Sequence, residues 1–314
     1  MLLNTGNKLY HLIRAVRPRQ WIKNLVVFAP IVFHGELFNP EYFAKEVLAF
    51  IYFSGIASAI YLMNDIKDIE KDRAHPIKKN RPIASGQLPV IWAMTAAISI
   101  LIIIIPTSFF FIGTFFGYVL VIYLLIQVLY NFKFKEVIIL DALTISIGFI
   151  LRAFAGALAI PVSISSWLIL AITGVSLLLA FGKRRAERTM LEARDISNIT
   201  TRSILRHYPD NLLNSMISMS ASFSIITYSL FAFQTSPEKN SGLGLVLEPF
   251  LPSTLVGAKL LMLTIPIVIY GVARYLYVIY EKREGESPER ILLNDKPLFY
   301  TTALWGFLVI LFMS

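Results

Sequence analysis

The sequence is dominated by long apolar runs that carry no charge, and these runs constrain the fold more than any other feature. The run from residue 90 to residue 111 contains no Asp, Glu, Lys or Arg, and as a helix it is long enough to cross the hydrocarbon core of a bilayer. Charged residues make up only 16% of the chain, whereas soluble domains carry about 25%. The runs are continuous rather than alternating, which argues against a transmembrane barrel. We therefore expect an all-α, polytopic membrane protein and exclude a soluble globule and a disordered chain.

The apolar runs predict about nine transmembrane helices in a single integral membrane domain over residues 1–314. The expected spans are 22–38, 41–65, 90–110, 112–131, 136–160, 164–183, 211–234, 252–280 and 297–314. Lys and Arg gather in the N-terminal segment and in every second loop, so the positive-inside rule places the N-terminus in the cytosol. We expect a multi-pass protein of the cell inner (plasma) membrane, with its active site on the cytosolic side.

The residue types that are absent or scattered exclude several kinds of chemistry. The chain has no cysteine, and its four histidines lie in four different segments. We therefore expect no disulfide, no thiol nucleophile and no metal site built from Cys or His. The net charge of +9 suits anionic substrates and anionic membrane lipids. Because this charge is divided among short loops, we expect no nucleic acid partner.

Carboxylates gather where the second predicted span leaves the membrane, at Asn64, Asp65, Asp68 and Asp72. On a continuous helix the three aspartates fall within a sector of about 60°. Like charges on one face repel one another, and oxygen ligands suit Mg²⁺, which binds one or two carboxylates together with substrate phosphates. We predict that these four residues form a Mg²⁺ site. The alternative is a solvated helix end whose acids pair with neighbouring lysines and arginines.

The loop that follows is basic and contains Lys78, Lys79 and Arg81. Lys78 and Arg81 are expected to bind phosphate oxygens, the arginine in bidentate fashion. Lys79 serves equally well as an anchor to lipid headgroups. Cations beside a predicted metal site favour a phosphorylated substrate at the cytosolic ends of the helices.

Three stretches together resemble a known family. The Asn-Asp-x-x-Asp-x-x-x-Asp spacing at 64–72 resembles the first aspartate-rich motif of the UbiA-type membrane prenyltransferases. The longer pattern at 64–86 more closely resembles one branch, the decaprenyl-phosphate phosphoribosyltransferases. The stretches at 17–24 and 287–297 are similar to the same branch, so the resemblance covers nearly the whole chain.

This resemblance implies a UbiA-like bundle of helices around a cavity that opens toward the cytosol. It implies transfer of 5-phosphoribosyl from 5-phosphoribosyl 1-diphosphate (PRPP) to a polyprenyl, decaprenyl-like monophosphate, with release of diphosphate and with Mg²⁺ as cofactor. Asp65, Asp68 and Asp72 are then catalytic, because a metal ion that they bind stabilises the departing diphosphate. The sequence gives no indication of the oligomeric state.

The chain departs from the family pattern after the sixth predicted span. A second aspartate-rich motif is usual there, whereas this chain has Lys183, Arg184 and Glu187 in a basic stretch. Such a stretch binds acidic groups directly rather than through a second metal ion. The resemblance therefore assigns these three residues to substrate binding. The alternative is that the two cations only anchor the helix at the cytosolic surface.

Two charges lie inside the fifth predicted span, at Asp141 and Arg152. On a helix they share a face and stand about 16 Å apart along the axis. An ionisable residue inside a membrane span is a candidate for function, although a structural network of buried polar groups is the alternative. Lys23 and Asn24 are further candidates for substrate binding, or else anchors beside Trp21 at the membrane interface.

Two other functions stay open on the sequence. The first is a UbiA-type prenyltransferase that acts on an aromatic acceptor, against which the basic stretch at 183–187 counts. The second is a transporter of lipid carriers without enzymatic activity. A transporter favours internal repeats with broken helices in corresponding places, and no convincing repeat is present.

Overall fold

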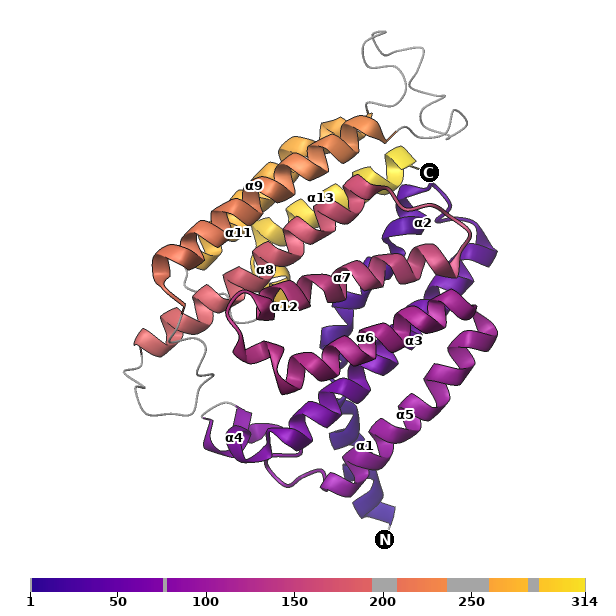
Figure 1. Cartoon of the computed structure of the whole chain (residues 1–314), viewed down its shortest axis with the longest axis vertical. Helices are drawn as coiled ribbons and strands as arrows, with labels where there is room; N and C mark the ends of the chain where they lie inside the picture. Colours follow the sequence, from indigo (N-terminus) through magenta and orange to yellow (C-terminus); the bar gives the residue numbers. More distant parts are fainter. Residues whose placement is uncertain (1, 76–77, 194–207, 236–259, 282–287, 314) are drawn as a thin grey trace.

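The structure, a computed structural model, describes residues 2–75, 78–193, 208–235, 260–281 and 288–313. These residues form helices and loops without strands (Figure 1), so the predicted all-α class is confirmed. Within these described ranges, eight helical segments are long and apolar enough to cross a membrane. They are α3 (Pro40–Lys67), α5 (Val90–Phe111), α6 (Thr114–Phe132), α7 (Leu140–Ala159), α8 (Ser166–Ala193), α9 (Asp210–Gln234), η6 with α11 (Leu260–Thr264 and Ile265–Tyr280) and α13 (Lys296–Met313). The chain is therefore a multi-pass membrane protein.

Eight of the predicted spans correspond to these eight segments, and the first part of one, 252–259, lies outside the described residues. The shorter helices are α1 (Leu2–Ala15), η1 (Pro18–Phe28), α2 (Ala29–Phe33), α4 (Ile69–Ala74), η2 (Lys78–Asn80), η3 (Phe134–Glu136) and α12 (Pro288–Asn294).

The first predicted span, 22–38, is not a regular α-helix. Its place is taken by the 3₁₀-helix η1 and the short α2. Figure 1 shows α1 near the N-terminus at one end of the bundle and α2 near the C-terminus at the other. Because a 3₁₀-helix rises about 2.0 Å per residue, η1 and α2 together extend about 30 Å, the thickness of the hydrocarbon core. The segment therefore crosses the bundle with fewer residues than an α-helix needs.

A close backbone contact holds this segment against α7. A Cβ atom added at Gly156 would overlap the carbonyl oxygen of Val27, so only glycine fits there. Val27 is fully buried. Small residues that let two backbones approach are a common device in membrane helix packing.

The helix that carries the acidic residues is interrupted at Asp68. Helix α3 ends at Lys67, Asp68 has φ −97° and ψ 15°, and α4 begins at Ile69. The single helical face expected for the three aspartates is therefore broken. Aspartate suits such a position, because its short side chain competes for backbone hydrogen bonds and disfavours helix interiors.

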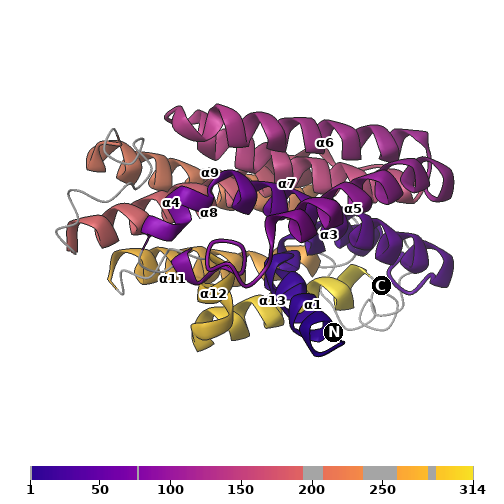
Figure 2. The same cartoon turned by 90° about the horizontal axis from the view of Figure 1, so that it is seen from below.

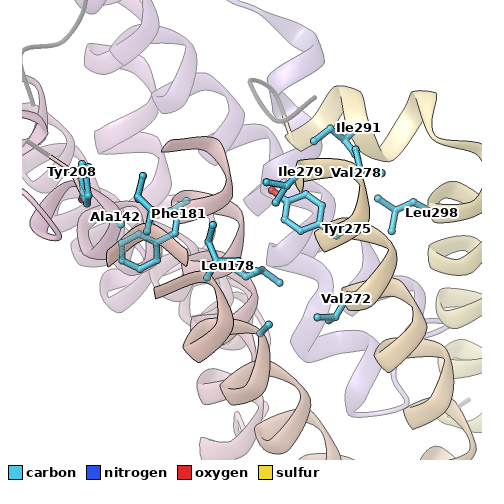
Figure 3. Packing of buried hydrophobic residues seen from close by; sticks show 14 residues of the cluster. Ala142, Leu178, Phe181, Tyr208, Val272, Tyr275, Val278, Ile279, Ile291 and Leu298 are labelled. Atoms are coloured by element: carbon cyan, nitrogen blue, oxygen red, sulfur yellow. The ribbon is translucent and has the colours of Figure 1, made fainter. Parts of the chain in front are cut away.

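The core sits between helices, and the outer surface is apolar. One buried cluster joins α8 to α11; Figure 3 shows Leu178 and Phe181 on one side and Tyr275 and Ile279 on the other. Outward-facing residues such as Phe110, which is 83% exposed, present an apolar surface to lipid. Figure 2 shows α6 along one edge of the bundle and α11 and α13 along the opposite edge.

Candidate active site

A large cavity runs into the bundle from the end that carries the acidic residues. Its volume is about 1870 Å³, more than the roughly 300–1,000 Å³ of ordinary small-molecule pockets. The carboxylates of Asp65, Asp68 and Asp72 line one part of it, and side chains such as Val268 and Trp305 line a mostly apolar part. The cavity therefore combines a charged region with an apolar region.

Asp65 and Asp72 are brought together by an arginine. Arg81 Nη1 lies 3.1 Å from Asp65 Oδ1 and 2.6 Å from Asp72 Oδ2. A second arginine, Arg17, forms an ion pair with the same oxygen of Asp65. Both aspartates are nearly inaccessible, at 2% and 4% exposed. The burial raises the pKa of Asp72 above its ordinary value, and the guanidinium of Arg81 opposes this shift.

Asp68 faces a different cation. Lys135, on η3 between α6 and α7, places its Nζ 3.3 Å from Asp68 Oδ2. Both residues line the cavity. All three aspartates therefore face the same space, but each is held by a basic residue. This arrangement differs from the alternative of a solvated helix end paired with neighbouring cations, because Arg17 and Lys135 come from distant segments and only Arg81 follows closely in the sequence.

The oxygen atoms at this site are of the type that binds a divalent cation. Asn64 Oδ1 and Asp65 Oδ2 are buried acceptors without a hydrogen-bond partner, and oxygen donors are what Mg²⁺ prefers. The described residues contain no ready-made group of three or more acidic or histidine side chains around one point. A metal ion held by all four residues would use these two oxygens together with carboxylate oxygens of Asp68 and Asp72 that Lys135 and Arg81 now contact.

Most of the remaining candidates also line the cavity. Lys23, Lys78, Lys183 and Glu187 are all part of its wall. Lys183 Nζ lies 3.8 Å from Glu187 Oε1, one helical turn away on α8. Together with Arg81 these residues give the charged part of the cavity a mixed but strongly basic lining.

Arg184 and Asp141 do not line the cavity. Their side chains are 1% and 0% exposed, and Arg184 Nε lies 2.5 Å from Asp141 Oδ2. Asp141 also accepts hydrogen bonds from the Tyr208 hydroxyl, at 2.6 Å, and from the backbone N–H of Ala142. The pair therefore joins α8 to α7, an arrangement that agrees with the structural network left open for Asp141. A role of the two residues in substrate binding stays a prediction.

Arg152 lies deeper and is held by neutral groups. It donates at 2.7 Å to Asn24 Oδ1, to the Gly148 carbonyl oxygen and to the Tyr123 hydroxyl. Arg152 borders the cavity, whereas Asn24 is 1% exposed and lies behind it. The structure thus brings these two predicted residues together, with Asn24 as a support for the arginine.

Sequence reasoning missed Arg17 and Lys135. Arg17 belongs to the stretch 17–24, in which only Lys23 and Asn24 were candidates for substrate binding, and it has the left-handed φ of 55° that few non-glycine residues adopt. Lys135 belongs to a loop with only two basic residues. The one available signal was that both segments lie on the positive side of the membrane.

An all-helical membrane bundle with an acidic and basic layer at the mouth of a cavity defines a class of membrane-embedded transferases. The UbiA prenyltransferase family is matched over residues 26–302, and the chain belongs to this family. Among solved structures, a UbiA homolog from Archaeoglobus fulgidus bound to GPP and Mg²⁺ is similar, with a TM-score of 0.64 and 18% identity. The match covers 96% of this chain and 99% of that one, and it shows the common fold.

Closer relatives carry a more specific name. The chain is 33% identical over 303 residues to the decaprenyl-phosphate phosphoribosyltransferase of Corynebacterium glutamicum, covering 96% of this chain and 86% of the relative. It is 38% identical over 226 residues to the protein of the same name from Mycolicibacterium smegmatis, covering 71% and 70% of the two chains.

Proposed function

We propose that the protein transfers 5-phosphoribosyl from PRPP to a polyprenyl phosphate and releases diphosphate. The observation that carries this proposal is the cavity itself, which joins a layer of carboxylates and guanidinium groups to a long apolar interior. A sugar diphosphate suits the first region and a lipid tail suits the second. The named relatives support the same reaction.

The volume and the charges of the cavity suit two substrates at once. A space of about 1870 Å³ exceeds the volume of an ordinary single-ligand pocket. Lys78, Arg81 and Lys183 line its charged part and serve as donors to phosphate oxygens. The basic stretch around Lys183 favours a phosphorylated sugar over an aromatic acceptor, because it provides no second set of acidic ligands.

In the proposed reaction the bond between the anomeric carbon of PRPP and its diphosphate breaks, and a bond to an oxygen of the lipid phosphate forms. The lipid phosphate is already ionised, so the chain needs no strong general base. Arg81 and Lys183 hold the phosphate groups in place, and the buried walls exclude water. A Mg²⁺ ion held by Asn64 and the three aspartates would supply neutralisation of the charge that develops on the diphosphate.

The setting of the site follows from the charge distribution. The cavity mouth lies among the basic segments around Arg17, Arg81 and Lys183, and the positive-inside rule places such segments in the cytosol. We therefore place the site on the cytosolic side of the inner membrane, with the N-terminus in the cytosol. PRPP is a soluble metabolite and reaches the site from that side.

The experiment is a comparison of substrates with the purified chain in detergent. Radiolabelled PRPP is offered with polyprenyl phosphates of several lengths, and geranyl diphosphate is offered with aromatic acceptors in parallel. The proposal predicts a labelled phosphoribosyl lipid in the first series and no prenylated product in the second. Prenyl transfer without phosphoribosyl transfer would replace the proposal by its main rival, and no product in either series would favour a transporter.

A further inference from the structure

Each aspartate at the mouth of the cavity is held by a cation of the chain. Asp65 pairs with Arg17 and Arg81, Asp72 pairs with Arg81, and Asp68 pairs with Lys135. The cations come from three segments: the start of η1, the loop after α4, and η3 next to α6. The carboxylates are thus neutralised from outside their own helix.

The local structure fixes the positions of two of these cations, Arg17 and Lys135. Arg17 has φ 55° and ψ 62°, a left-handed conformation that is strained in a non-glycine residue and tends to occur at functional sites. Its guanidinium also lies 5.1 Å from the centre of the Tyr61 ring. The side chain of Lys135 is only 11% exposed. Both residues line the cavity beside the aspartates.

The ion pairs leave part of the site unsatisfied. Asp65 is 2% exposed, and its Oδ2 has no hydrogen-bond partner, as is also true of Asn64 Oδ1. A buried acceptor without a donor is unfavourable, whereas a bound cation would satisfy both oxygens. Arg17 and Lys135 therefore neutralise the carboxylates without saturating them.

We propose that Arg17 and Lys135 are diphosphate-binding residues that exchange partners when a divalent cation and a diphosphate bind together. The carboxylates then turn to the metal ion, and the two cations turn to the phosphate oxygens. The inference deepens the proposed function, since it takes a diphosphate as ligand. It assigns substrate-binding roles to two residues that form ion pairs with the aspartates in this structure.

Exchange of partners makes the two ligands cooperative. A metal ion alone has to compete with Arg17, Arg81 and Lys135 for the carboxylates. A diphosphate alone meets cations that are engaged, next to three negative charges. When both bind, each ligand releases the partners that the other one needs, and by thermodynamic linkage the effect is the same in both directions.

The test measures metal binding without turnover. The full chain in detergent is titrated with Mn²⁺, read by electron paramagnetic resonance, with and without inorganic diphosphate, after correction for the Mn²⁺–diphosphate complex in solution. The central variant is Lys135→Met. Lys71→Met is the matched control, because Lys71 also lines the cavity but pairs with none of the three aspartates in the described part of the chain.

We expect diphosphate to tighten Mn²⁺ binding to the wild type by about 5- to 150-fold, the usual range of coupling. Lys135→Met should bind Mn²⁺ alone several-fold more tightly than both the wild type and Lys71→Met, and should lose most of the coupling. Lys135→Arg should restore it. Arg17→Met is expected to behave like Lys135→Met.

The inference is overturned if Lys135→Met binds Mn²⁺ alone less tightly, which is the result for a purely supporting role. It is equally overturned if Lys135→Met and Lys71→Met bind Mn²⁺ alike, because a general charge effect then suffices. A thermal melt of each variant in detergent confirms folding. Phosphoribosyl transfer by the wild type is measured separately, so that loss of the coupling and failure of the proposed function are distinguishable.

Discussion

The buried ion pair between α7 and α8 allows a quantitative test of the structure. Arg184 Nε and Asp141 Oδ2 lie 2.5 Å apart, and both side chains are at most 1% exposed. Removal of one partner from such a pair costs about 3–5 kcal/mol. In Asp141→Leu the arginine keeps Glu187, at 2.5 Å, so we expect the lower end, about 3 kcal/mol, which is about a 100-fold change in the unfolding equilibrium.

The assay is reversible unfolding in mixed micelles, with the free energy of unfolding compared across variants. The double variant Asp141→Leu with Arg184→Met removes both charges, and we expect it to recover most of the loss. Lys45→Met is the control, because its partner Glu41 is 72% exposed and such surface pairs contribute at most about 1 kcal/mol. If the double variant were as unstable as Asp141→Leu, or if Asp141→Leu unfolded like the wild type, the pair would not hold the helices together.

Three more predictions follow from single positions. Gly156→Ala should destabilise the protein by about 1–3 kcal/mol through overlap with the Val27 carbonyl oxygen, whereas Gly306→Ala, with open space around its Cβ position, should be neutral or stabilising in the same melt. Burial raises the pKa of Asp72 above 3.8 in the folded protein. As the pH rises above 3.8, the Asp72 carboxyl therefore loses its proton in the unfolded chain before it does so in the folded protein, and the free energy of unfolding should fall. The metal-free protein and its Asp72→Asn variant should therefore differ in how their stability changes with pH in this window, and identical pH profiles of unfolding would contradict this.

The helical architecture could be predicted because hydropathy determines it. Uncharged runs such as the one at 90–111 have to lie in lipid, and their lengths match the helices that form. The segment η1 could not be predicted in the same way. It packs closely against α7 at Gly156, and such a contact between two distant segments cannot be recognised from hydropathy.

The sequence indicated which types of residue belong to the candidate site, but it did not predict how they are arranged. The sequence placed Asp65, Asp72 and Arg81 in one region, but it assigned Arg81 to phosphate oxygens, whereas the structure pairs it with both aspartates. Local periodicity predicted one continuous helix and gave no sign of the break at Asp68. It also gave no sign of the partner Lys135, which lies 67 residues further along the chain. The pairing of Arg184 with Asp141 could not be predicted either, because a motif gives the residue but not the direction in which its side chain points.

One measurement tests the account most directly: formation of labelled phosphoribosyl lipid from PRPP and polyprenyl phosphate by the wild type and by Asp65→Asn, each with Mg²⁺ and with excess EDTA. The substitution keeps the size of the side chain and removes the negative charge of the Asp65 carboxylate. We predict product only for the wild type with Mg²⁺, while a thermal melt shows Asp65→Asn to be folded. Equal product from Asp65→Asn, or undiminished product in EDTA, would contradict the assignment of this carboxylate layer as the catalytic centre.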